Sequence, residues 1–224
     1  MRIKSLFCSL FTLLMGNAQE TYIYCGKLID TQNGKVLTNK TIVVSGKLIK
    51  NIQDGFVVPT ESDTKIIDLK SKTVMPGWID MHVHLESETS PKEYLERFTL
   101  NDADVAYNAE VLAKTTLMAG FTTVRDLGGT GVNVSLRNAI NKGLVVGPRI
   151  FTAEKSIATT GGHADPTSGF KKELMGNPGP KEGVINSVDE ARQAVRQRYK
   201  NGADWIKITA TGGVLSVAKS GSNP

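Results

Sequence analysis

The sequence predicts an α/β protein in which a small β-sandwich precedes a parallel sheet with crossover helices. Residues 22–69 carry short apolar segments separated by turn residues, as the strands of a sandwich do. From residue 74 onward, apolar strand patterns alternate with segments that carry Ala, Val and Leu at helical spacing. Such alternation is typical of βα units with a parallel sheet. We therefore place a domain boundary between residues 73 and 74.

The first 18 residues are predicted to be a signal peptide and not part of the fold. A positively charged start at residues 1–4 precedes an apolar run from Leu6 to Met15, which is too short to span a bilayer. Small residues follow, and we expect cleavage after Ala18. The mature protein would be exported, either to a periplasm or to the medium. It would keep Cys25 as its single cysteine and could form no intrachain disulfide.

Composition argues against a nucleic-acid or membrane partner. The chain has 224 residues, of which 40% are hydrophobic and 22% charged, an ordinary globular balance. The net charge is +5, but the lysines are scattered and aromatic residues make up only 6%. No basic stripe interleaved with aromatic residues is present, so nucleic-acid binding is not expected. After signal cleavage no remaining segment is apolar enough to cross a membrane.

Four strands are expected in the first domain, residues 19–73. Gly46 separates two of them and predicts a tight hairpin. The four predicted strands are Tyr22–Ile29, Thr41–Ser45, Lys47–Ile52 and Lys65–Leu69.

The second domain, residues 74–224, is expected to contain four strands and three helices. Ser187 is a suitable N-cap with Glu190 three residues later, which predicts a capping box. Asn201-Gly202 should end the same helix. The predicted helices span residues 102–119, 133–141 and 187–200, and the predicted strands are Val74–Leu85, Phe121–Leu127, Arg149–Ile157 and Asp204–Thr211.

The first of these strands carries two of the three histidines of the chain, His82 and His84. Residues two apart on a strand share a face, so both imidazoles point the same way, with Asp80 beside them. Two neutral imidazoles at one strand end can bind a divalent metal ion. The alternative is two unrelated histidines on a strand.

The segment Met-Pro-Gly-Trp-Ile-Asp-Met-His-Val-His, residues 75–84, resembles the first barrel strand of the amidohydrolase superfamily. Residues 121–129, Phe-Thr-Thr-Val-Arg-Asp-Leu-Gly-Gly, resemble its imidazolonepropionase-like and prolidase-like branch, which includes Xaa-Pro dipeptidases. The resemblance implies a (β/α)8 barrel after a β-sandwich lobe that is completed by C-terminal strands. It also implies that His82 and His84 bind the more buried metal of a mono- or binuclear site.

The resemblance further implies that residues 74–224 form only the first half of the barrel, strands 1–4. A closed barrel takes eight strands and about 250 residues. We therefore expect a truncated chain or a fragment of a longer one. A half-barrel that dimerises is the alternative, so a homo-oligomer stays open.

Lys207 lies in the fourth predicted strand, where it shares one face with Trp205 and Thr209. A lysine inside a barrel is costly unless its amine is neutral, and burial lowers its pKa. Residues 202–209 match the position at which binuclear amidohydrolases carry a carboxylated lysine. The resemblance thus implies that a carbamate on Lys207 bridges two metal ions. The alternative is a lysine that reaches solvent at a strand end.

His163 lies in the glycine-containing segment 159–165, after the third predicted strand, and loops in this position build the active sites of barrels. The segment resembles one in prolidase-like amidohydrolases whose histidine faces the substrate. A loop histidine without a role is the alternative, and the role of Asp165 stays open. Arg125 and Asp126 alternate in and out, so only one can face the barrel centre; a structural ion pair is expected rather than catalysis, and their role stays open. Glu86 and Glu88 are predicted to be loop carboxylates.

Taken together, these residues predict a metal-dependent amidohydrolase that cleaves an amide or peptide C–N bond with metal-activated water. The expected substrate is a small molecule, with a dipeptide favoured, and the expected cofactor is a divalent metal, zinc, with two ions in the complete protein. The general base is expected beyond Pro224, so no catalytic residue is assigned and the fragment alone is expected to be inactive. The alternatives are a cyclic amide or imidazolone hydrolase and a truncated, non-catalytic product.

Overall fold

The computed structural model describes residues 19–213, and the chain divides into two compact units, Met1–Pro76 and Gly77–Pro224. Each unit is described by itself. The predicted signal peptide, residues 1–18, lies outside the described residues. None of the helices in the described part is long and apolar enough to span a membrane.

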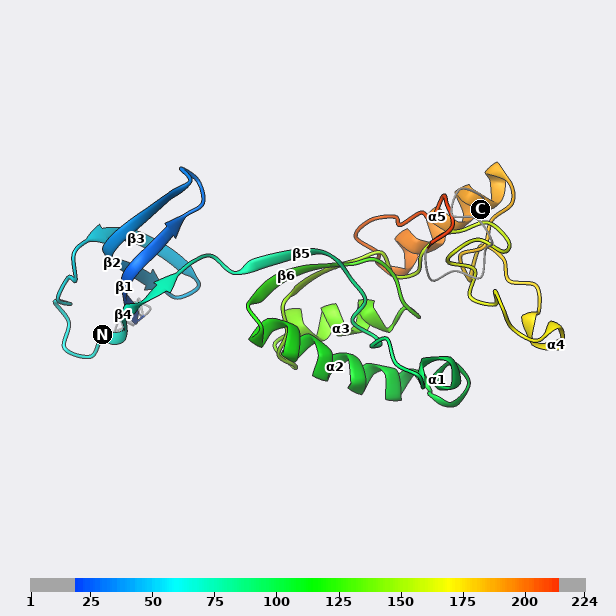
Figure 1. Cartoon of the computed structure of the whole chain (residues 1–224), viewed down its shortest axis with the longest axis horizontal. Helices are drawn as coiled ribbons and strands as arrows, with labels where there is room; N and C mark the ends of the chain where they lie inside the picture. Colours follow the sequence, from blue (N-terminus) through cyan, green and yellow to red (C-terminus); the bar gives the residue numbers. More distant parts are fainter. Residues whose placement is uncertain (1–18, 214–224) are drawn as a thin grey trace, which may run out of the picture. The chain divides into compact units, whose positions relative to one another are not determined.

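The first unit is a four-stranded sheet with the order β3-β2-β1-β4 (Figure 1). β1 pairs antiparallel with β2 and parallel with β4, and β2 pairs antiparallel with β3. Gly46 has a φ of 58° in the β2–β3 turn, which confirms the predicted hairpin. The strands are β1 (Glu20–Asp30), β2 (Lys35–Ser45), β3 (Leu48–Asp54) and β4 (Lys65–Val74).

One face of this sheet carries a small apolar core around Cys25, Leu28 and Ile42. Burial raises the pKa of the free Cys25 thiol. Residues 19–76 form a single sheet, and the second layer of the predicted sandwich is not among them. The sandwich therefore stays a prediction. β2 and β4 are longer than predicted because both follow β1 along its length, with Leu28 pairing with Leu37 and with Val74.

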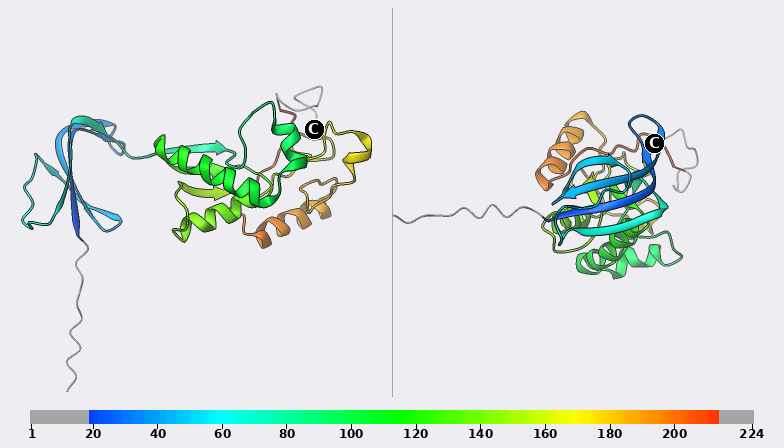
Figure 2. Two further views of the ribbon diagram at one scale, coloured as in Figure 1. Left: turned by 90° about the horizontal axis from the view of Figure 1, so that it is seen from below. Right: turned by 90° about the vertical axis from the view of Figure 1, so that its left-hand side faces the viewer.

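The second unit contains a parallel three-stranded sheet with the order β5-β6-β7, and α2 and α3 pack against it (Figures 1 and 2). Ala109 and Ala113 of α2 and Leu136 of α3 meet Val124 of β6 and Ile150 of β7 in its core. The strands are β5 (Trp78–Val83), β6 (Phe121–Asp126) and β7 (Arg149–Thr152). The helices are α1 (Glu93–Thr99), α2 (Asp102–Met118), α3 (Val132–Asn141), α4 (Lys172–Met175) and α5 (Val188–Asn201).

The three predicted helices are confirmed as α2, α3 and α5, with ends within one residue of the prediction. Ser187 is the N-cap of α5, and its side chain accepts a hydrogen bond from the backbone N–H of Glu190. Glu190 reaches back to the N–H of Asn186, one residue before the one that a capping box requires. Gly202 ends the helix with a φ of 93°. α1 and α4 were not predicted.

The strand predictions are less accurate. β5 begins at Trp78 and not at Val74, and a Cβ on Gly77 would lie 2.1 Å from the Thr122 side chain, so the chain passes close to β6 there. β7 ends at Thr152 because Glu154 takes a φ of 63°. The fourth predicted strand, residues 204–211, is wrong as a regular strand. Its described residues form only a parallel bridge between Ile157 and Ile208.

Glu154 ties the end of β7 to the α5 helix. Its carboxylate oxygen Oε2 lies 2.8 Å from Nε of Arg198, and both side chains are almost fully buried. Oε1 accepts a hydrogen bond from Asn201 Nδ2 at 2.9 Å. Nη2 of Arg198 also donates to the carbonyl oxygen of Lys181 at 2.6 Å. The pair therefore joins β7, α5 and the loop before α5.

Replacement of Arg198 by Met should lower the free energy of unfolding by about 3–5 kcal/mol, because Glu154 would remain buried without a cation. Urea unfolding followed by circular dichroism would measure the change. Arg192→Met is the matched control, since Arg192 lies on the same helix and pairs with Asp189 on the surface. Equal unfolding midpoints for the two variants would contradict the structural role of the buried pair.

Candidate metal centre

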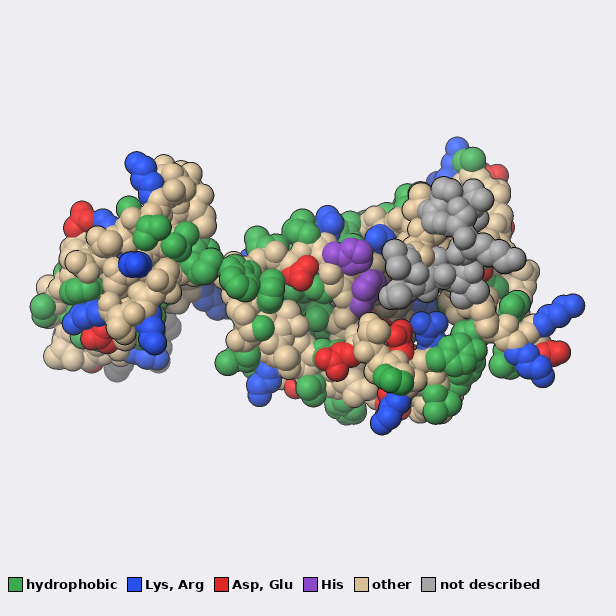
Figure 3. Space-filling model, in the orientation of Figure 1, with side chains coloured by type: hydrophobic (Ala, Val, Ile, Leu, Met, Phe, Trp, Pro, Cys, Tyr) green, Lys and Arg blue, Asp and Glu red, His purple; other side chains and the backbone are tan. Residues whose placement is uncertain are grey.

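His82 lies in β5 and His84 directly follows its last residue, Val83, and the strand period of two residues places both side chains on one face. The two ring centroids are 5.5 Å apart and the rings are inclined by 63°. Both residues are exposed, and histidine side chains gather on the visible surface of the second unit in Figure 3. The structure therefore brings the two predicted ligands together.

The ring of His84 is held by the loop that follows β6. Its Nδ1 lies 2.7 Å from the carbonyl oxygen of Gly128. Because a carbonyl oxygen can only accept a hydrogen bond, Nδ1 carries the proton in this contact. The lone pair of Nε2 is then free, and this is the arrangement in which a histidine serves as a metal ligand.

The environment of His82 favours its neutral form. Partial burial, followed by the positive charges of Lys207, His84 and Arg125, lowers the pKa of its imidazole. The backbone N–H of His82 donates to Oδ1 of Asp80 at 2.9 Å, which fixes the strand at this point. A neutral imidazole is the species that binds a metal ion.

Lys207 lies in a segment that runs beside the loop after β7, and its carbonyl oxygen accepts a hydrogen bond from the N–H of Ile157 at 2.8 Å. It lines a hollow of about 260 Å³ together with Arg125 and Trp205. Its charge acts on His82, so the structure brings this third predicted residue within electrostatic range of the histidine pair. Among residues 19–213 no three His, Cys, Asp or Glu side chains converge as a metal site. The ligand roles of His82, His84 and Lys207 stay predictions.

His163 lies in a loop that Asp165 organises. Oδ2 of Asp165 accepts from the N–H of Gly161 at 2.8 Å, and Oδ1 accepts from the backbone N–H and the hydroxyl of Thr167, both at 2.9 Å. The His163 ring packs against Gly213, where an added Cβ would lie 2.6 Å from it. In the described part of the chain no hydrogen bond or ring contact joins His163 to His82 or His84. Its contact with substrate stays a prediction.

The predicted ion pair between Arg125 and Asp126 is wrong, because neighbouring residues on a strand point to opposite faces. Arg125 donates from Nε to the carbonyl oxygen of Met81 at 2.7 Å, and its guanidinium lies 4.6 Å from the centroid of the Trp205 ring. Asp126 is fully buried on the other side. Burial raises the pKa of its carboxyl group, against the opposing effect of the N–H groups that bind it.

Glu86 and Glu88 both lie in the loop after β5, as predicted, and Glu86 is buried there whereas Glu88 is exposed. The Glu86 oxygens accept from the backbone N–H groups of Thr130, at 2.5 Å, and Asn133, at 2.7 Å. A carboxylate at the N-terminus of α3 satisfies unpaired N–H groups and opposes the helix dipole. The glycine at position 129 is the sequence feature that fits this role. A Cβ there would lie 2.4 Å from the Glu86 carboxyl carbon, so only glycine leaves room for the carboxylate.

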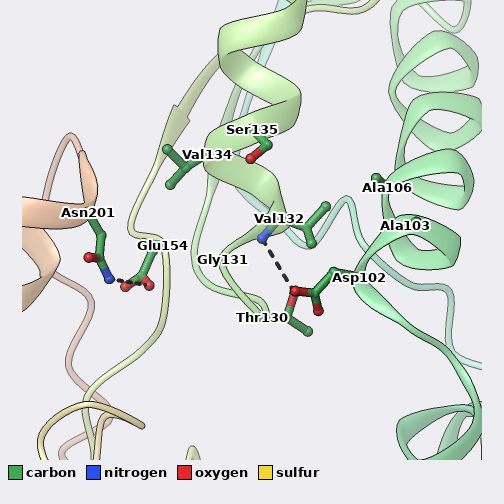
Figure 4. A pocket seen from close by; sticks show the side chains of 10 residues that line it. All are labelled: Asp102, Ala103, Ala106, Thr130, Gly131, Val132, Val134, Ser135, Glu154 and Asn201. Carbon is green, nitrogen blue, oxygen red and sulfur yellow. Dashed lines mark hydrogen bonds between the residues drawn. The ribbon is translucent and has the colours of Figure 1, made fainter.

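A separate cavity of about 500 Å³ lies where the first turn of α3 faces Asp102 of α2 and Asn201 of α5 (Figure 4). Gly131, at the N-cap of α3, and the Glu154 carboxylate also line it. None of the predicted site residues does, so the cavity is distinct from the candidate metal centre.

Comparisons with known proteins all point to one family. Residues 73–222 match the model of the amidohydrolase family. Ochratoxinase from Aspergillus niger is 31% identical over 220 residues, which cover 89% of this chain and 44% of that protein.

Two solved structures resemble the chain over 92% of its length. One is a Xaa-Pro dipeptidase with methionine bound in its active site. The TM-score is 0.86, the sequence identity is 49%, and the match covers 50% of that protein. The other is a prolidase in complex with N-methylphosphonate-L-proline. The TM-score is 0.75, the sequence identity is 32%, and the match covers 49% of that protein. The chain thus spans about half the length of the proteins it matches.

Replacement of Asp165 by Ala should loosen the loop that carries His163, because three donor groups lose their acceptor. We expect the amide hydrogens of Gly161 and Thr167 to exchange about tenfold faster, which corresponds to roughly 1.4 kcal/mol of local stability. NMR-detected hydrogen exchange would measure it. Asp30→Ala is the control, since Asp30 binds the N–H groups of Gln32 and Asn33 in a turn of the first unit. Unchanged exchange at Gly161 and Thr167 would show that Asp165 does not hold the loop.

Proposed function

The chain belongs to the amidohydrolase family, as its sequence predicts, and we propose that it carries half of the metal centre of an enzyme that hydrolyses an amide or peptide C–N bond. The observation that carries this proposal is the pair formed by His82 on β5 and His84 directly after it, with ring centroids 5.5 Å apart and Nδ1 of His84 fixed on the Gly128 carbonyl oxygen. The pair offers two imidazole nitrogens on one face of a strand end, the position where barrels of this kind hold their active sites.

We propose a divalent metal ion, zinc, as the cofactor of this site, with two ions in the complete protein. The donor set fits such an ion, since imidazole nitrogens suit zinc and the pKa of His82 is lowered so that the ring is neutral. When bound, the metal would polarise the scissile carbonyl and lower the pKa of a water molecule. The residues of this chain would hold the ions through His82, His84 and a carboxylated Lys207.

Carboxylation of Lys207 requires its neutral amine, because only the free nitrogen lone pair can attack carbon dioxide. The new N–C bond and the loss of one N–H proton leave a carbamate anion. Arg125 lines the same hollow, and its positive charge would attract an anionic carbamate. An anion with two oxygens suits a position between two cations.

A dipeptide with proline as its second residue is the substrate that we propose. The support is the 49% identity to a Xaa-Pro dipeptidase and the likeness to a prolidase that binds a phosphonate analogue of proline. His163 would contact this substrate from its loop after β7. The general base would lie outside this chain, so we propose that the 224 residues alone do not turn over substrate.

Export is also proposed, since the apolar run Leu6–Met15 follows a positively charged start. The mature N-terminus should then be Gln19, and N-terminal sequencing of the exported protein would identify it. Recovery of the chain with Met1 intact from the cytoplasm would contradict this proposal.

Substitution of Lys207 tests the metal centre, in a chain extended to the length of its relatives. Lys207→Ala should lose most of the bound metal and nearly all hydrolysis of Xaa-Pro dipeptides, while the fold survives. Lys207→Arg should fail equally, because a guanidinium stays charged and cannot accept carbon dioxide. Added short-chain carboxylic acids should restore part of the activity of Lys207→Ala by replacing the carbamate.

Metal content by elemental analysis and steady-state rates would provide the measurements. Lys200→Ala is the control, since Lys200 is an exposed lysine on α5. Full metal content and wild-type turnover in Lys207→Ala would exclude Lys207 as a ligand.

A further inference from the structure

The carboxylate of Asp126 is buried at the end of β6, with no residual exposure. No lysine or arginine pairs with it in the part of the chain that the structure describes. A buried carboxylate without a cation is costly unless N–H groups satisfy it. The hydrogen-bond donors to the Asp126 carboxylate therefore indicate which part of the structure this residue positions.

Three donors bind this carboxylate. Oδ2 accepts from the backbone N–H of Leu85 at 3.0 Å. Oδ1 accepts from the backbone N–H of Gly128 at 3.1 Å and from Nδ2 of Asn133 at 2.9 Å. Leu85 directly follows His84, and Gly128 is the residue whose carbonyl oxygen accepts from His84 Nδ1. One carboxylate thus fixes the backbone on both sides of the His84–Gly128 contact.

The neighbouring loop leaves these groups little freedom. Asn133 is itself fixed, since its Nδ2 also donates to the carbonyl oxygen of Glu154 and its backbone N–H donates to Glu86. Gly128 has a φ of 132°, and a Cβ there would lie 2.5 Å from Oγ of Ser156. Asp126 holds the N–H of Gly128, and the N–H of Gly129, which shares its peptide group with the Gly128 carbonyl oxygen, donates to the carbonyl oxygen of Glu154 at 2.9 Å. The two bonds together aim the Gly128 carbonyl oxygen, and Asn133 links them because it donates to both Asp126 and the Glu154 carbonyl oxygen.

We propose that Asp126 is a positioning residue for the metal ligand His84. It holds the Gly128 carbonyl oxygen where it accepts the proton of Nδ1, and this selects the tautomer with a free Nε2 lone pair. The inference rests on the proposed function, in which His84 binds metal through Nε2. Outer hydrogen-bond partners of this kind fix the tautomer and orientation of metal-binding histidines.

A purely structural Asp126 makes a different prediction. It would stabilise the turn after β6, and its loss would lower the stability of the second unit without changing the protonation of His84. The tautomer of His84 in metal-free protein distinguishes the two roles, because stability alone does not set which ring nitrogen carries the proton.

Asp126→Asn is the decisive variant in the 224-residue chain. Asparagine has the same shape but only one acceptor oxygen, so its NH2 group must face the N–H of Leu85 or of Gly128. Long-range 1H–15N correlation spectra report the two tautomers, and His84→Gln assigns the signals. We expect the Nδ1–H form to predominate in the wild-type chain and a mixture with the Nε2–H form in the variant. Affinity for zinc ions should fall on the order of 10- to 100-fold.

Two further variants keep the test informative. Ile150→Ala opens a cavity in the core of the same unit and touches none of these polar groups, so the tautomer and zinc affinity should stay as in the wild type. Asn133→Ala removes one of the donors to Asp126 and should give a smaller shift in the same direction. It replaces Asp126→Asn if that variant does not fold.

The outcomes separate this inference from the proposed function. Zinc binding through His84 with an unchanged tautomer and affinity in both folded polar variants would overturn the role of Asp126 and leave the metal centre standing. A tautomer shift, with no zinc bound even by a chain extended to the length of its relatives, would support the positioning role and remove the metal centre. A loss of affinity in Ile150→Ala equal to that in Asp126→Asn would assign the effect to stability and overturn the inference.

Discussion

The buried contact between Glu154 and Arg198 is the interaction on which the second unit depends. Glu154 stands at the point where β7 ends, with a φ of 63° that interrupts the strand. Its carboxylate is bound by the side chains of Arg198 and Asn201 of α5. Its carbonyl oxygen accepts from Gly129 in the loop after β6 and from Asn133 in the first turn of α3. Removing two charges from water is costly, so a buried ion pair adds little net stability. Its main effect is to fix the relative positions of the elements that carry the two residues. Here the geometry is the meeting of β7, α5 and the loop after β6.

From this meeting point a chain of polar contacts runs to the candidate metal centre. Asn133 donates both to the Glu154 carbonyl oxygen and to the Asp126 carboxylate, and Asp126 binds the residues on either side of the His84–Gly128 contact. The arrangement has a cost, since Oδ1 of Asn133 and Nη1 of Arg198 are buried and have no hydrogen-bond partner among the described residues. A network of this kind fixes side chains closely only when nearly all of its members are satisfied. The orientation of the His84 ring is thus coupled, through Gly128, to Asp126, Asn133 and Glu154.

The sequence predicts the local features of this fold well and the long-range features poorly. α2, α3 and α5 follow from helical spacing and end residues such as Ser187 and Gly202, which act within one turn. The pairing of His82 and His84 follows from the period of a strand. The role of Glu86 does not, because its donors lie 44 and 47 residues further along the chain. The end of β7 at Thr152 could not be predicted from the sequence either. The left-handed backbone conformation of Glu154 depends on side chains of α5, which no local sequence pattern contains.

The exposure of β5 on both of its faces bears on how the candidate site works. Strands of parallel sheets are usually covered on both faces, yet Ile79 and Met81 of β5 are 61% and 52% exposed. Their apolar character favours further structure packed against this face of β5, which agrees with the predicted (β/α)8 barrel and with relatives of about twice the length. His82 and His84 are exposed as well. Electrostatic stabilisation of a reacting carbonyl is strong only where water is excluded, so the proposed chemistry requires further structure around the histidine pair. The described residues therefore supply the position of the ligands, and the dielectric environment has to come from what covers them.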